Sequence, residues 1–127
     1  MIKDVITMLP SDTELKVLTY LWKNGSCKAI QIANAFSAEF GWAKNTTYTI
    51  ITRAIKKGLI QRTDPGFICT PLVEQKDIQT SSLDEVLKTF FHNSNFELVK
   101  SLISGTKFSN EEINELYSLI DEEKRLK

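Results

Sequence analysis

The sequence has few of the residues from which catalytic and metal sites are built. Its 127 residues include two cysteines and a single histidine. Cys27 and Cys69 have no CxxC spacing, and His92 alone cannot hold a metal, because a protein metal site needs several ligands. The chain also has no GxGxxG loop, no GxSxG motif and no P-loop. We therefore expect neither an enzyme nor a bound cofactor.

A long apolar segment is missing too. No apolar run approaches the roughly 18 residues that indicate a membrane span. The N-terminal stretch carries Asp4 and has no apolar region of the kind found in secretory signals. Two cysteines without a pairing motif are typical of a reducing compartment, where they serve as small buried apolar residues. These features predict a cytoplasmic protein.

The chain has no net charge, but its charges are unevenly distributed. Sixteen Lys and Arg balance sixteen Asp and Glu. Residues 1–71 hold nine basic and five acidic side chains, whereas residues 72–127 hold seven basic and eleven acidic ones. No acidic residue occurs from Lys44 to Thr63. A polyanionic partner would therefore meet the first half of the chain.

Two helices are predicted at the start of the chain. Ser11 and Glu14 form a capping box that opens the first, which carries an apolar stripe of leucines. The second covers about residues 28–39 and ends at Gly41, with a poor capping residue at Lys28.

The next stretch, KNTTYTIITRAIKKG, combines strand-favouring residues with a helical rhythm. Its small and apolar residues recur at the spacing of one helix face, namely at Thr47, Ile50, Ile51, Ala54 and Ile55. A strand would alternate with a period of two residues, and the adjacent Ile50 and Ile51 break that pattern. We therefore predict a helix over residues 44–57, followed by Gly58.

A two-stranded hairpin is predicted after this helix. Residues 60–63 and 67–70 have strand character, the intervening Asp-Pro-Gly is a turn signal, and Pro71 closes the hairpin. Three short helices followed by a hairpin is the order of a winged helix-turn-helix. The predicted fold is therefore mainly α, with three helices and a two-stranded wing in residues 1–72 and a helical dimerisation region in residues 73–127.

The second region should be helical from about Glu74, and Ser109 with Glu112 forms another capping box. Its helices carry wide apolar stripes that a chain of this size cannot bury by itself. Dimerisation with a second copy is the simplest way to bury them. The alternative is that these helices fold back on the first region. The residues predicted to form the homodimer contact are Leu83, Val86, Leu87, Phe90, Phe91, Leu98, Leu102, Ile113, Leu116 and Ile120.

The face of helix 44–57 opposite its apolar stripe is polar but carries no carboxylate. Hydroxyls, an amide and cations are the groups that contact base edges and phosphates. A merely solvated helix face is the alternative. The residues predicted to contact DNA are Lys44, Asn45, Thr46, Tyr48, Thr49, Thr52, Arg53, Lys57 and Arg62. Asn45, Tyr48 and Thr49 would lie nearest the bases.

Three segments resemble the penicillinase repressor (BlaI/MecI/CopY) family of bacterial transcriptional regulators. They are ELKVLTYLWKNG at residues 14–25, GWAKNTTYTIITRAIKKGLIQR at 41–62 and SNEEINEL at 109–116. The resemblance implies a homodimeric winged-helix repressor that binds inverted-repeat DNA operators built around TACA and TGTA. A winged helix that binds a protein partner instead of DNA is the alternative function.

The sequence also departs from that family. The wing is short and ends in DPGF, and Thr47 stands where the family has an apolar residue. No cysteine follows Cys69, so the metal-binding tail of the copper-responsive members is absent. In the antibiotic-responsive branch a membrane metalloprotease cleaves the dimerisation helices, so the resemblance implies such a sensor as a further partner. Some members are cut at an Asn-Phe bond, and Asn95-Phe96 is such a pair. It lies several residues upstream of where the family's site aligns, which favours a chance match over a cleavage site.

Overall fold

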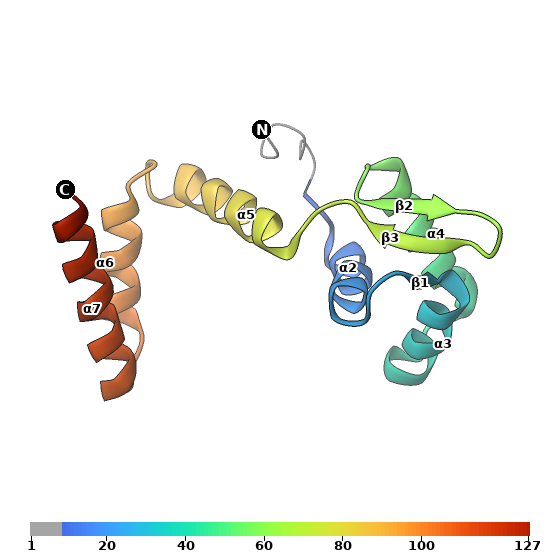
Figure 1. Cartoon of the computed structure of the whole chain (residues 1–127), viewed down its shortest axis with the longest axis horizontal. Helices are drawn as coiled ribbons and strands as arrows, with labels where there is room; N and C mark the ends of the chain where they lie inside the picture. The colour runs from blue at the N-terminus through green and yellow to red at the C-terminus, as the bar shows by residue number, and fades with distance from the viewer. Residues whose placement is uncertain (1–8) are drawn as a thin grey trace. The chain divides into compact units, whose positions relative to one another are not determined.

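The structure is a computed structural model that describes residues 9–127 and divides into two compact units (Figure 1). The first unit ends at Leu83, and the second covers Asp84–Lys127. The expectation that the chain has no secretory signal rests on Asp4 and its neighbours, which lie outside the described residues. Within the described part, no helix is long and apolar enough to cross a membrane.

The described part of the first unit begins with three helices, as predicted. They are α2 (Asp12–Asn24), α3 (Ala29–Phe40) and α4 (Lys44–Lys56). The capping box of α2 is formed: the Ser11 hydroxyl accepts from the Glu14 N–H, and the Glu14 carboxylate accepts from the Ser11 N–H at 3.0 Å. The helical prediction for the threonine-rich stretch is therefore confirmed.

The sheet contains one strand in addition to the predicted two-stranded wing. Strands β2 (Ile60–Thr63) and β3 (Ile68–Pro71) form the expected hairpin, and β1 (Cys27–Lys28) pairs with the other edge of β3 in an antiparallel sheet of order β1-β3-β2. The two-stranded wing is therefore confirmed, and the third strand of the sheet was not predicted. Two residues are too few to show an alternating pattern, so the strand exists only through its long-range pairing with β3.

The core of the first unit lies between its three helices and the sheet. Helix α4 contributes a buried face that matches the predicted stripe, and the fully buried side chains include Leu18, Leu21, Ile32, Ile51 and Leu59. Burying one such side chain contributes about 1.5–3 kcal/mol relative to leaving it exposed. The Trp22 indole N–H donates to the Val73 carbonyl at 2.9 Å, which ties the chain after the wing to α2.

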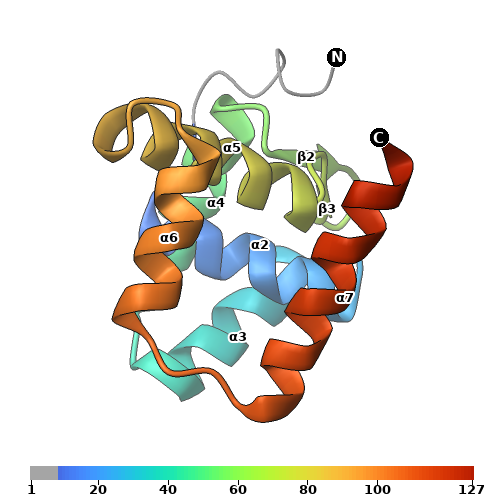
Figure 2. The same ribbon diagram turned by 90° about the vertical axis from the view of Figure 1, so that its left-hand side faces the viewer.

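The second unit contains the end of α5 (Gln75–Phe90), then α6 (Asn95–Gly105) and α7 (Asn110–Leu126). Figure 2 shows α6 and α7 as an antiparallel pair, with both helices on the same side of the loop that joins them. Ser94 caps α6, and Ser109 with Glu112 forms the predicted capping box of α7. Neither α6 nor α7 contains a buried residue.

Candidate nucleic-acid interface

Helix α4 turns one face to the core and the opposite face to solvent. Thr47, Ile50, Ile51 and Ala54 are buried. The opposite face lines a shallow surface groove and consists of Asn45, Tyr48, Thr49, Thr52, Arg53 and Lys56. The structure thus gathers on one surface six polar side chains that the helical spacing placed together. Five of them are among the predicted DNA contacts.

Two threonine hydroxyls on this surface are already bonded to the helix itself. Thr49 Oγ1 donates to the Asn45 carbonyl, and Thr52 Oγ1 donates to the Tyr48 carbonyl, both at 2.9 Å. Each hydroxyl thereby uses its proton but keeps its lone pairs. A base that meets Thr49 would therefore find an acceptor and a methyl group.

The cations at the two ends of this surface have no carboxylate partner in the part of the chain that the structure describes. Among residues 9–127, no ion pair involves Lys44, Arg53 or Lys56, and all three are exposed. Thr46 is exposed beside Lys44. The residue before the helix, Ala43, supplies no side-chain cap. Its carbonyl accepts from the Thr46 N–H, whereas the Lys44 and Asn45 N–H groups have no partner within residues 9–127 and lie at the positive end of the helix dipole. This end of α4 suits a phosphate.

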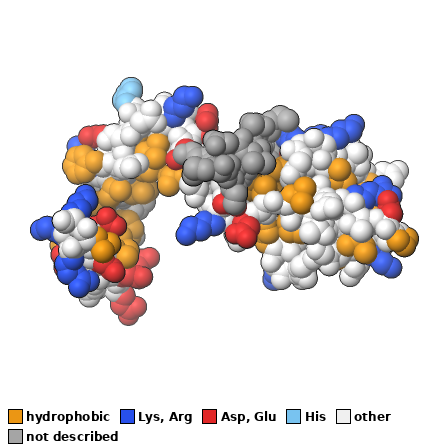
Figure 3. All heavy atoms as spheres, turned by 45° about the horizontal axis from the view of Figure 1, so that its top comes forward, with side chains coloured by type: hydrophobic (Ala, Val, Ile, Leu, Met, Phe, Trp, Pro, Cys, Tyr) orange, Lys and Arg blue, Asp and Glu red, His pale blue; other side chains and the backbone are white. Residues whose placement is uncertain are grey.

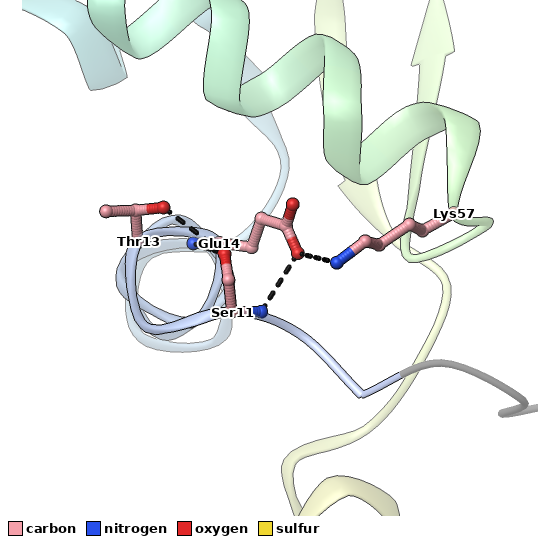
Figure 4. A network of polar contacts seen from close by, with 4 residues as sticks. All are labelled: Ser11, Thr13, Glu14 and Lys57. Carbon is pink, nitrogen blue, oxygen red and sulfur yellow. Dashed lines mark hydrogen bonds and ion pairs between the residues drawn. The ribbon is translucent and has the colours of Figure 1, made fainter.

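Lys57 is placed differently from the other predicted DNA contacts. Its ammonium lies 2.7 Å from Oε1 of Glu14, whose side chain is completely buried, whereas that of Lys57 is 24% exposed. Figure 4 shows that the same carboxylate oxygen also accepts from the Ser11 N–H. One carboxylate therefore joins the start of α2 to the end of α4.

The ionisation of Glu14 depends on this arrangement. Burial opposes the charged carboxylate, but the hydrogen bonds from Lys57 and Ser11 outweigh it and lower the pKa of Glu14. The pair is thus an ionised salt bridge at neutral pH, and its lysine is engaged within the protein.

Arg62 is also engaged, within the wing. Its Nε donates to the Asp64 carboxylate at 3.1 Å, and its guanidinium carbon lies 3.7 Å from the centroid of the Phe67 ring. The Phe67 ring in turn contacts Tyr48 of α4, with 5.7 Å between the ring centroids. The wing therefore meets the open face of α4 through one aromatic side chain.

The turn before α4 is fixed by an aromatic cluster. Trp42 lies edge-on to Phe36, with ring centroids 5.4 Å apart, and Phe40 lies 5.1 Å from Trp42. Tyr20 of α2 packs edge-on against Phe36 at 5.9 Å. Aromatic pairs of this kind contribute about 0.5–1.5 kcal/mol each beyond their buried area. They hold α3 and α4 in the arrangement that exposes the polar surface.

The residues predicted for the dimer contact lie mostly at the surface of the second unit. Phe90 is 72% exposed and Ile120 is 55% exposed, and Leu83, Val86, Leu102, Ile113 and Leu116 are exposed as well. Phe91 and Leu98 are half-buried. Leu87 is the exception, since it is buried within the single chain. A charge at Leu87 would therefore disturb the chain's own packing as well as any contact with a partner.

The thiols and acids form no metal site in the part of the chain that the structure describes. Cys27 and Cys69 face each other across strands β1 and β3. Burial raises the pKa of both thiols, that of Cys69 to about 11. Both are therefore protonated, unreactive side chains at neutral pH, and they pack against the core.

Two residues important to this surface were not predicted from the sequence. Glu14 was identified only as a capping residue, because its local pattern explains it fully and its partner lies 43 positions away. Phe67 was assigned only to a strand, although its backbone is in the left-handed region, with φ of 49°. The local sequence does not predict this conformation, because the left-handed region is usually occupied by glycine or asparagine and rarely by phenylalanine.

The comparisons with known proteins agree with this geometry. A sequence profile of the penicillinase repressor family matches residues 10–122. The penicillinase repressor of Bacillus licheniformis is 30% identical over 119 residues, which cover 92% of this chain and 93% of that protein. Methicillin resistance regulatory protein MecI of Staphylococcus aureus (strain N315) is 26% identical over 113 residues, which cover 87% and 92%.

A solved structure resembles the first part of the chain. It is the solution structure of the DNA binding domain of the repressor BlaI, with a TM-score of 0.50 and 29% sequence identity. The match covers 57% of this chain and 89% of that domain. A mainly helical fold with a winged-helix unit is therefore confirmed.

Proposed function

The chain belongs to the penicillinase repressor family and is a DNA-binding repressor, and we propose that helix α4 reads its DNA. In this proposal α4 lies in the major groove, with Asn45, Tyr48 and Thr49 nearest the base edges. The observation that supports it is the exposed, carboxylate-free face of α4, where hydroxyl and amide groups lie beside cations that form no ion pair within residues 9–127.

Phosphate contacts are proposed for Lys44, Thr46 and Arg53, with Thr52 beside them. These side chains are exposed, and the two cations have no carboxylate partner among the described residues. We expect smaller contributions from Lys57 and Arg62, because each is bonded to a carboxylate of its own unit. Their bonds would have to break before either cation met a phosphate.

We further propose that the protein acts in the cytoplasm as a homodimer joined through its second unit. The support is the exposed apolar residues of α6 and α7, in which a single chain buries nothing. They include Ile103, Ile113, Leu116 and Ile120, which line a common, mostly apolar groove. In such a dimer the two first units, one from each chain, would bind the two halves of an inverted repeat.

Binding to two DNA duplexes over a range of salt concentrations tests the proposal. One duplex carries inverted TACA and TGTA half-sites, and the other has the same bases in scrambled order. We expect tighter binding to the first, and a steep loss of affinity with salt for both. Arg53→Ala should weaken both by a similar factor and reduce the salt slope by about one. Arg125→Ala, in the second unit, should leave the slope unchanged.

The outcome that contradicts the proposal is equally specific. Salt-independent binding, or no binding to either duplex by the folded parent protein, would exclude α4 as a DNA-reading helix. A change in base preference with Arg53→Ala, at an unchanged salt slope, would contradict the phosphate role of this residue.

A further inference from the structure

Phe67 has a left-handed backbone conformation in the wing. It stands between β2 and β3 with φ of 49°, in the left-handed region that bulky residues rarely adopt. Such a strained residue persists only where its surroundings hold it. Here the Phe67 carbonyl accepts from the Ala29 N–H at 2.9 Å, and its N–H donates to the Asp64 carboxylate at 3.3 Å.

The conformation directs the Phe67 side chain toward two predicted DNA contacts. Its ring centroid lies 5.7 Å from that of Tyr48 on α4 and 3.7 Å from the Arg62 guanidinium. Arg62 is held from its other side by Asp64, at 3.1 Å. The Phe67 ring is half-buried and packs against the core. It is therefore a fixed surface against which both side chains rest.

Tyr48 needs such a surface if it is to read a base. Its own side chain is only half-buried, and its hydroxyl has no hydrogen-bond partner within residues 9–127. A base contact requires a well-directed hydrogen bond, which weakens steeply as the angle departs from linear. A ring restrained on one side loses less conformational entropy when that bond forms.

We propose that Phe67 is a positioning residue for base recognition: it holds the Tyr48 ring in the orientation in which the free hydroxyl meets the DNA. The inference rests on the proposed function of α4. It assigns the short wing a role that needs no contact between the wing tip and DNA. The wing acts on specificity through the recognition helix, by way of one aromatic contact.

The test compares the ratio of affinities for the inverted-repeat and scrambled duplexes among three substitutions of Phe67 in the full-length protein. Phe67→Leu keeps an apolar side chain but removes the ring, and should lower the ratio about tenfold. Phe67→Tyr keeps the ring and should stay within about twofold of the parent. Phe67→Gly removes the ring while accepting the left-handed backbone without strain, and should match Phe67→Leu even if the leucine variant folds poorly.

A second substitution separates positioning from packing. In a Tyr48→Ala background the ring still supports Arg62, but the contact proposed for Arg62 is to phosphate and is the same in both duplexes. Phe67→Leu should therefore change the ratio no further in that background. An unchanged ratio in Phe67→Leu and Phe67→Gly, or the same tenfold loss without Tyr48, would overturn the inference. Failure of the proposed function is distinguishable, because the parent itself would then bind both duplexes equally.

Discussion

The two units of the molecule bury their apolar residues to very different extents. The first encloses a continuous core made by α2, α3, α4 and the sheet. Within residues 84–127, by contrast, only Leu87 is buried. Figure 3 shows apolar side chains reaching the surface of the C-terminal helices. The first unit thus satisfies its apolar residues with its own chain, and the second does not.

This difference indicates where each unit obtains its stability. Isolated helices of 11 or 17 residues are marginal in water, and most helical stability in proteins comes from packing an apolar face. Exposed apolar patches of this kind mark interaction sites. We infer that the first unit folds by itself, whereas the second depends on a partner, for which a second copy is the simplest choice.

The largest expected effect comes from placing a charge in the second unit's exposed apolar face. Ile120→Asp should dissociate the dimer, because burying an unpaired carboxylate costs several kcal/mol. Operator affinity should then fall by a factor of about 10²–10⁴, since the two DNA-binding units are no longer linked and must bind separately. Ultracentrifugation at micromolar concentration, paired with operator titrations, measures both quantities.

Ser118→Asp is the matched control for this substitution. It adds the same charge to α7 on the side away from the apolar residues, and the mass should remain that of a dimer. A parent chain that is monomeric under these conditions, or an Ile120→Asp variant that still dimerises, would remove the distinction between the two units.

A smaller effect is expected on the stability of the first unit when its buried salt bridge is broken. Lys57→Ala leaves the buried Glu14 carboxylate without its cation and should lower the free energy of unfolding by about 3 kcal/mol. Lys56→Ala removes a neighbouring exposed lysine and should change stability by about 0.5 kcal/mol or less. Denaturant unfolding of a fragment ending at Leu83 gives both values. Equal effects for the two lysines would show that the buried pair contributes nothing.

The sequence was sufficient for features that depend on neighbouring residues. The rhythm of Ile50, Ile51 and Ala54 predicted helix α4 against the strand propensities of its threonines, because one buried face outweighs local preference. The capping boxes at Ser11 and Ser109 were predicted for the same reason.

Features that depend on distant residues were not predictable in this way. Strand β1 exists only because Cys27 pairs with Cys69, and the salt bridge of Lys57 joins it to Glu14, 43 positions away in the sequence. The Phe67 ring contacts the Tyr48 ring, 19 positions away on α4. In each case the missing information is a tertiary contact, which composition and spacing do not contain.

Acid should destabilise the first unit through Glu14. Its pKa is lowered in the folded state, so the stability it contributes is present above the pKa of the unfolded chain and is lost as pH falls through the folded value. Glu14→Gln should therefore flatten the pH dependence of unfolding in the acid range for the fragment ending at Leu83. Glu39→Gln, an exposed carboxylate of α3, is the control and should leave the profile unchanged. A profile that is identical with and without Glu14 would contradict an ionised buried pair.

The smallest expected effects come from one substitution made on the two faces of α4. Thr47 is buried and its hydroxyl has no hydrogen-bond partner among the described residues, so Thr47→Val should raise stability by about 1 kcal/mol and leave DNA binding unchanged.

Thr49→Val changes the exposed face instead. The hydroxyl proton of Thr49 is already donated to Asn45, and valine keeps the methyl group, so only an acceptor is lost. The ratio of inverted-repeat to scrambled affinity should fall about fivefold, which corresponds to about 1 kcal/mol. Stability should hardly change, because both residues are β-branched. If Thr49→Val left the ratio unchanged while Tyr48→Ala lowered it, base reading would belong to Tyr48 alone. If neither change lowered it, the open face of α4 would be only a solvated surface.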